Sequence, residues 1–190
     1  FGTHLDTLMT SKDKLSKMDG AAADLCVIEN EDEFSENDIE APAGALFNIT
    51  DQKTLYSKNA NDEREIASIT KIMTALLAMK YADLSQEVTI SYTPEGLESS
   101  AVLCGFEQGD KMMLSSLLSA ALIYSGNDAA IDIAIAVAGS QEAFVDMMNQ
   151  ESKELMTSHT HFANPTGLTQ SKHYSSVYET AITRMQQERM

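Results

Sequence analysis

Helix-length runs of apolar residues dominate the middle of this chain. Residues 72–79 are strong helix formers that contain neither Gly nor Pro, so we predict a helix that begins near Ser68. Residues 112–124 are apolar enough for a buried helix, and residues 128–138 form another apolar run in which small side chains predominate. Together these runs predict a cluster of helices that pack against one another.

Polar residues mark where two further helices begin. Ser140 precedes Gln141 and Glu142, an arrangement typical of a helix N-terminus, and we predict a helix from there to about Met156. A last helix is predicted for residues 175–189.

Short apolar segments between polar turns predict a small amount of β-structure. Residues 44–49 and 54–58 flank a polar turn that contains Asp51, which predicts a β-hairpin. Residues 87–92 and 101–104 are predicted to be further short strands. The predicted fold class is therefore α+β, with a helical cluster packed on an antiparallel sheet.

The first 40 residues differ in composition from the rest. Residues 19–40 contain nine Asp or Glu and no Lys or Arg, with few large apolar side chains. Such a segment repels itself and buries little surface, so residues 1–40 are predicted to be an acidic, partly mobile N-terminal extension. The domain proper is predicted to span residues 41–190.

Charge and composition narrow the classes of partner. The 190 residues are 43% hydrophobic and 22% charged, as in a globular domain, and the net charge of −16 would repel nucleic-acid phosphates and anionic lipid surfaces. No apolar run approaches the roughly 20 residues of a membrane-spanning helix, so no membrane attachment is visible. The spacing of Cys and His residues predicts neither a metal site nor a cofactor, and Cys26 and Cys104 could form one disulfide or remain two thiols.

Ser68 and Lys71 are the first candidates for catalysis. Residues three apart lie on one face of a helix, which places the Ser68 hydroxyl beside the Lys71 side chain. A serine hydroxyl becomes a nucleophile when a base removes its proton, and lysine can be that base if its pKa is lowered. The pair also has a purely structural interpretation, in which Ser68 caps a helix and Lys71 is solvated.

A second motif, Ser125-Gly126-Asn127, lies between two of the apolar runs and has the composition of an ordinary turn. A serine, a lysine three residues later and a Ser-x-Asn on an inter-helical loop together resemble the motifs of penicillin-binding proteins and class A β-lactamases. The motif sequences of this chain most closely resemble those of the D-alanyl-D-alanine carboxypeptidases, which are low-molecular-mass penicillin-binding serine peptidases. The resemblance covers roughly residues 41–188, and the matching stretches are residues 43–47, 55–60, 67–77, 125–130, 161–168 and 173–176.

The resemblance implies a role for each candidate residue. Ser68 would be the acylated nucleophile, and Lys71 would be the base that deprotonates it. Ser125 would relay a proton to the leaving amine, and Asn127 would bind the substrate amide and the Lys71 side chain. It also implies a peptidoglycan stem peptide ending in D-Ala-D-Ala as substrate, β-lactams as inhibitors, and an extracytoplasmic location.

The chain departs from the family in one respect. No Lys-Thr-Gly or Lys-Ser-Gly motif is present, and the last lysine, Lys172, is followed by His173. In the family that motif lies on a later strand of the sheet, so the resemblance implies a penicillin-binding fold that is incomplete at its C-terminus and lacks the C-terminal strands.

Three hypotheses follow from this departure. The first is a serine-type D-Ala-D-Ala carboxypeptidase, and the second is an inactive fragment or a non-catalytic binding module of the same fold. The third is a β-lactamase or a β-lactam-recognising sensor. A class A β-lactamase would carry a Glu-x-x-Leu-Asn loop after the Ser-x-Asn motif, and residues 151–156 do not match it.

Overall fold

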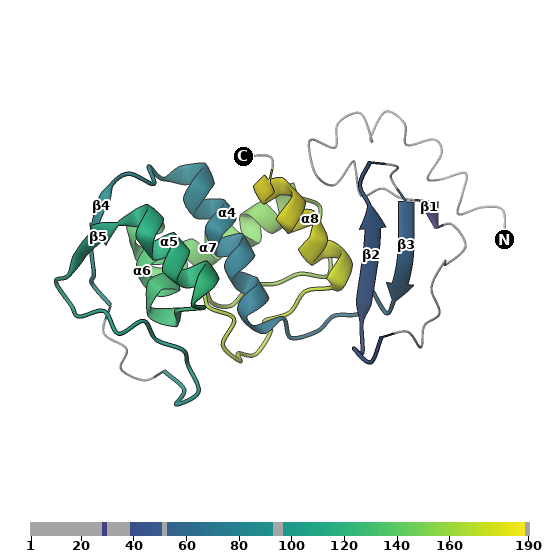
Figure 1. Ribbon diagram of the computed structural model, residues 1–190, viewed down its shortest axis with the longest axis horizontal. Coiled ribbons are helices and arrows are strands. Elements are labelled where there is room, and N and C mark those ends of the chain that lie inside the picture. Colours follow the sequence, from purple (N-terminus) through teal and green to yellow (C-terminus); the bar gives the residue numbers. More distant parts are fainter. Residues whose placement is uncertain (1–27, 30–38, 51–52, 93–96, 189–190) are drawn as a thin grey trace.

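The computed structural model of this chain describes residues 28–29, 39–50, 53–92 and 97–188 (Figure 1). Figure 1 shows a cluster of helices with the β2–β3 sheet at one end, which confirms the predicted α+β class. In chain order the elements are β1 (Ile28–Glu29), β2 (Gly44–Asn48), β3 (Lys53–Lys58), the 3-10 turn η1 (Ala67–Thr70), α4 (Lys71–Tyr81), β4 (Glu87–Thr89), β5 (Lys111–Met113), α5 (Leu114–Ile123), α6 (Asn127–Ala138), α7 (Gln141–Glu154) and α8 (Val177–Glu188).

Helix α4 is the centre of the helical cluster. Its first turns are buried on almost every side, including Lys71 and residues 73–78. A helix that is buried all round belongs in the middle of a fold rather than on its surface. Helices α5, α6, α7 and α8 all contact it, and Figure 1 shows it between them. The candidate base therefore sits at the start of a largely enclosed helix.

Two apolar cores meet along α4. One core joins α4 to α7 and α8 and includes Leu77, Phe144 and Ile182. The other joins α4 to α5 and α6 and includes Leu117 and Ile133. Helix α6 contributes alanines to both cores, and their small side chains leave room for the close approach of α4.

Strands β2 and β3 form the predicted antiparallel hairpin, with a bulge between Leu46 and Phe47. Strand β1 adds to β3 in parallel, so the strand order is β1-β3-β2. Helix α8 packs on this sheet, where the rings of Phe47 and Tyr178 meet edge to face with centroids 5.8 Å apart. Most of the predicted 1–40 extension lies outside the described residues, and the domain boundary near residue 41 stays a prediction.

One predicted strand is wrong, and two short strands, β1 and β5, were not predicted. Residues 101–104 form no strand, because Asp128 accepts hydrogen bonds from the backbone N–H groups of Cys104 and Gly105, at 3.0 and 2.9 Å. A side chain thus satisfies the amides that a ladder would have used. The predicted helix of residues 112–124 begins at Leu114 instead, since β5 pairs antiparallel with β4 just before it.

The later helices agree with the sequence prediction to within two or three residues. Ser140 caps α7 by accepting a hydrogen bond from the Ala143 backbone N–H at 3.1 Å. Helix α7 ends at Glu154 and α8 begins at Val177. In the part of the chain that the structure describes, no helix has the length and apolar character needed to cross a membrane. Within the same residues, no group of three or more His, Cys, Asp or Glu side chains is placed to hold a metal ion.

Replacing Phe144 by alanine tests the first core. Its side chain is fully buried (0% exposed), so Phe144→Ala should lower the free energy of unfolding by about 3–5 kcal/mol, as measured by urea denaturation. Ile123→Ala is the control, because Ile123 is 87% exposed and its loss should change stability by less than about 0.5 kcal/mol. Equal effects of the two substitutions would contradict this description of the core.

Candidate active site

Ser68 lies on the 3-10 turn η1, directly before the central helix. The prediction of an α-helix that begins near Ser68 is therefore corrected by three residues, because α4 itself begins at Lys71. Ala67 has a φ of 44°, in the left-handed region that residues other than glycine seldom adopt. Such strained positions concentrate at functional sites. The turn leaves Ser68 exposed at the surface.

Lys71 is buried although its side chain ends in an amine. Only 2% of the residue is exposed, and burial lowers its pKa from 10.5 to about 8. Its Nζ lies 3.2 Å from the Ser68 Oγ. Neither η1 nor α4 has a side-chain cap. The structural interpretation of the pair, a capping serine beside a solvated lysine, is therefore wrong.

The Ser125-Gly126-Asn127 motif reaches the same amine from the turn between α5 and α6. Asn127 Oδ1 accepts a hydrogen bond from Lys71 Nζ at 2.9 Å, and Ser125 Oγ lies 3.4 Å from that nitrogen. Ser125 Oγ also donates to Ser68 Oγ at 2.8 Å. The structure thus brings together all four residues that the sequence singled out. Their solvent exposure increases from the buried Lys71 and Asn127, through the half-buried Ser125, to the exposed Ser68.

The turn that carries Ser125 is held from both sides. Ser125 has a φ of 64°, and a Cβ added at the following Gly126 would collide with Cys104 Sγ. The Asn127 backbone N–H donates to the Val102 carbonyl at 2.8 Å, and the Asp128 carboxylate accepts from the backbone N–H groups of Cys104 and Gly105. Residues 102–105 therefore stabilise the conformation of the Ser125-Gly126-Asn127 motif.

A fourth neighbour of Lys71 is a backbone group, which the motifs in the sequence do not indicate. The Thr166 carbonyl accepts a hydrogen bond from Nζ at 2.8 Å. Next to it, the Pro165 carbonyl accepts from Thr74 Oγ1 at 2.7 Å, one turn further along α4. Residues 164–167 contain Asn, Pro and Gly, which are typical of a turn. No sequence signal shows where the carbonyls of a turn point.

His173 ties this turn to the nucleophile segment. Its Nδ1 accepts a hydrogen bond from the Ala163 backbone N–H at 3.0 Å, which assigns the proton of the neutral ring to Nε2. Nε2 then donates to Thr70 Oγ1, 2.7 Å away and adjacent to Lys71. Burial, with a contribution from nearby His161, lowers the pKa of His173. The ring is therefore held neutral in a bridge that only one tautomer can make.

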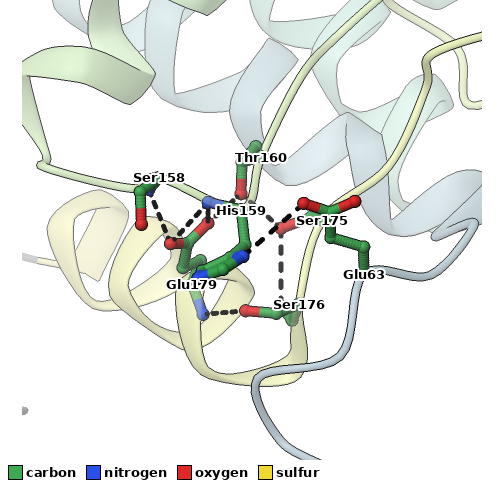
Figure 2. Close-up of polar contacts among 7 residues, drawn as sticks. All are labelled: Glu63, Ser158, His159, Thr160, Ser175, Ser176 and Glu179. Atoms are coloured by element: carbon green, nitrogen blue, oxygen red, sulfur yellow. Dashed lines mark hydrogen bonds and ion pairs between the residues drawn. The ribbon is translucent and has the colours of Figure 1, made fainter.

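A second anchor holds the chain just before this turn. Figure 2 shows the Glu179 carboxylate of α8 facing the backbone of Ser158 and His159. Glu179 Oε1 accepts from both amides, at 2.7 and 2.9 Å, and Oε2 accepts from Thr160 Oγ1 at 2.6 Å. A buried carboxylate is tolerated when it receives several donors in this way. The segment that leads to the active-site turn is thereby fixed to α8.

The bridge through His173 predicts a pH-dependent stability. The folded pKa of His173 lies below the unfolded value of 6.5, so between the two values the unfolded chain binds more protons. Its contribution to stability should be complete above pH 6.5 and should be lost as pH falls through the folded pKa. Urea unfolding at a series of pH values should show a smaller loss in His173→Gln, which keeps a donor near Thr70 and does not titrate.

The matched control is His159→Gln. His159 is half exposed and pairs with Glu63 at 3.5 Å, so this variant should keep the wild-type loss of stability below pH 6.5. An undiminished pH dependence in His173→Gln would contradict the assigned tautomer bridge.

Comparisons with known proteins identify the family and the fold of this chain. A sequence model of the D-alanyl-D-alanine carboxypeptidase family matches residues 30–189. The chain is 40% identical over 148 residues to D-alanyl-D-alanine carboxypeptidase DacF of Bacillus subtilis, a match that covers 75% of this chain and 38% of DacF. The chain therefore spans well under half of that relative.

Solved structures show the same fold. Penicillin binding protein 6B from Escherichia coli is similar with a TM-score of 0.70 and 28% identity, over 83% of this chain and 53% of that one. A mutant of the Streptomyces K15 DD-transpeptidase is similar with a TM-score of 0.75 and 26% identity, over 80% and 62% of the two chains. With the family match, these likenesses show that the chain belongs to the D-alanyl-D-alanine carboxypeptidase family.

Proposed function

We propose that this chain carries the acylation centre of a serine-type D-Ala-D-Ala carboxypeptidase that acts on peptidoglycan stem peptides. Ser68 is the nucleophile, Lys71 is its base, Ser125 is the proton relay and Asn127 binds substrate. The observation that carries the proposal is the contact of the buried Lys71 amine with both serine hydroxyls, at 3.2 and 3.4 Å. A base must lie within hydrogen-bonding reach of the proton that it removes.

The first chemical step forms an ester on Ser68. The Ser68 Oγ attacks the carbonyl carbon of the D-Ala-D-Ala bond while its proton moves to the neutral Lys71 Nζ. The C–O bond forms as the carbonyl π bond opens to an oxyanion. We infer that the Ser68 backbone N–H is one donor to this oxyanion, where stabilisation of developing charge is usually the largest catalytic term.

The second step releases the terminal D-alanine. When the oxyanion collapses, the C–N bond breaks. The leaving amine takes the proton that Lys71 Nζ had received, and this proton passes through Ser125, which lies between Lys71 and Ser68. Water then hydrolyses the acyl-enzyme and restores the Ser68 hydroxyl. A β-lactam supplies an acyl group to the same serine, and a penicillin binding protein is among the similar structures, so we propose β-lactams as inhibitors. Because peptidoglycan is the proposed substrate, we also propose a location at the cell envelope, outside the cytoplasm.

The Lys-Thr-Gly motif of the family is absent from these 190 residues. In the family resemblance it anchors the substrate carboxylate and brings the second oxyanion donor. By analogy with the loss of one such donor, we expect this chain alone to react about 10²–10³-fold more slowly than a centre that has the motif. The family match and the named relatives support the carboxypeptidase and do not favour the second hypothesis, a non-catalytic binding module of the same fold.

Acylation by a fluorescent penicillin tests the proposal. Intact mass and peptide mapping should find one adduct on Ser68, and Ser68→Ala should abolish it. Lys71→Ala should slow the reaction by about 10²–10⁴-fold. Because the base must be neutral, the wild-type rate should rise with pH through about 8, the value to which burial lowers the pKa of Lys71.

Matched controls are Ser119→Ala and Lys111→Ala, because both side chains are exposed on the surface and both variants should label at the wild-type rate. Release of D-alanine from a peptide ending in D-Ala-D-Ala then separates the candidates. An adduct without release would favour the binding module. A folded chain that takes no adduct would contradict the proposed acylation centre.

A further inference from the structure

Lys71 faces more acceptors than a neutral amine can serve. Asn127 Oδ1 and the Thr166 carbonyl can only accept hydrogen bonds, and they lie 2.9 and 2.8 Å from Nζ. A neutral amine has two N–H donors and one lone pair. If both donors go to these two oxygens, the lone pair is left for a hydroxyl that donates, and the Ser68 Oγ lies 3.2 Å away. The two acceptors therefore orient the base.

The Thr166 carbonyl is aimed by the side chain of Asn164. Asn164 Oδ1 accepts from the backbone N–H of Thr166 at 3.1 Å, from that of Gly167 at 2.7 Å, and from Thr166 Oγ1 at 2.9 Å. Its Nδ2 donates to the Leu168 carbonyl at 2.9 Å. One side chain thus closes the whole turn from within.

The turn is also set in place against the segment that carries the nucleophile. Gly167 has a φ of 85°, and a Cβ on it would overlap the Ala67 carbonyl, so the two backbones touch. The bond from Thr74 Oγ1 to the Pro165 carbonyl fixes the other side of the turn to α4. A change in the shape of this turn would therefore move the Thr166 carbonyl relative to Nζ.

We propose that Asn164 is a positioning residue for the Lys71 base, acting through the Thr166 carbonyl to direct the lone pair of the amine at Ser68. The inference rests on the proposed function for its catalytic consequence. After the Ser68 proton has moved to Nζ, the ammonium has three donors, for Asn127, Thr166 and Ser125. The fixed acceptors therefore serve the base before and after the transfer.

The groups that hydrogen-bond to Nζ carry no formal charge, so their arrangement, rather than a charged partner, influences the protonation state of Lys71. The groups that face it from η1, from the α5–α6 turn and from residues 163–168 are uncharged hydroxyl, amide and carbonyl groups. Among the described residues, Lys71 takes part in no ion pair. Loosening the turn should admit water and stabilise the ammonium.

The chain offers a matched control in Asn149. Like Asn164 it is half-buried and bonds to the backbone, with Oδ1 accepting from the Phe162 N–H at 2.9 Å and Nδ2 donating to the Phe162 carbonyl at 2.8 Å. It stabilises the segment just before the turn, but none of its partners touches Lys71. A general loss of stability would follow from either substitution, whereas disorientation of the base would follow only from the loss of Asn164.

The pH dependence of acylation is the first readout. In Asn164→Ala, the rise in labelling rate with a fluorescent penicillin should move up by about one pH unit, which lowers the rate at pH 7 about tenfold. Asn149→Ala should leave the position of that rise unchanged. Thr166→Val, which keeps the volume of the buried side chain but removes its bond to Asn164, should give a smaller shift in the same direction. Equal shifts in Asn164→Ala and Asn149→Ala would overturn the proposal.

A double-mutant cycle gives a readout that does not need activity. The urea midpoints of Asn164→Ala, Lys71→Met and the double variant should be non-additive, because Asn164 acts on Lys71 through Thr166. The cycle of Asn149→Ala with Lys71→Met should be additive. If Asn164→Ala does not fold, Thr166→Val takes its place in the cycle. Additivity in the Asn164 or Thr166 cycle would overturn the proposal. If the wild type takes no adduct, the proposed function fails and this cycle alone decides the positioning role.

Discussion

The burial of one amine is the constraint on which this structure depends. Lys71 is almost completely enclosed at the start of the central helix, and its Nζ is surrounded by oxygens of Ser68, Ser125, Asn127 and Thr166. Removing an ammonium from water is costly, and no carboxylate among the described residues compensates it through an ion pair. The enclosure therefore favours the neutral amine, which is the form that can act as a base.

Three parts of the fold surround that site and position its residues. Helix α4 provides Lys71, the α5–α6 turn provides the second motif, and residues 163–173 close the third side. Each support is fixed by a polar side chain that binds backbone groups: Asp128 holds the segment beside the motif, Glu179 the segment that leads to the turn, and Asn164 the turn itself. Apolar packing places the helices, and these polar anchors then set the atoms within hydrogen-bonding distance.

The sequence predicted what depends on side-chain type and periodicity. Long apolar runs located the helices, and the spacing of Ser68 and Lys71 indicated one face of a helix. Prediction from the sequence failed where contacts with distant residues determine the local structure. Residues 101–104 look like a strand until Asp128 takes their amides, and η1 replaces the first turn of the predicted helix. The Thr166 carbonyl could not be predicted at all, because every residue has a carbonyl and only the folded turn shows which one faces Nζ.

The most direct test of this account is the ionisation of Lys71 in the folded protein. An NMR titration of the lysine side chains, with Lys71→Met to assign the signal, should show one amine that titrates near pH 8, well below the ordinary value of 10.5. In urea the same signal should return to the ordinary value. A Lys71 that titrates near 10.5 in the folded chain would contradict the account, because at pH 7 only about three amines in ten thousand would then carry a lone pair for Ser68, against about one in ten at a pKa of about 8.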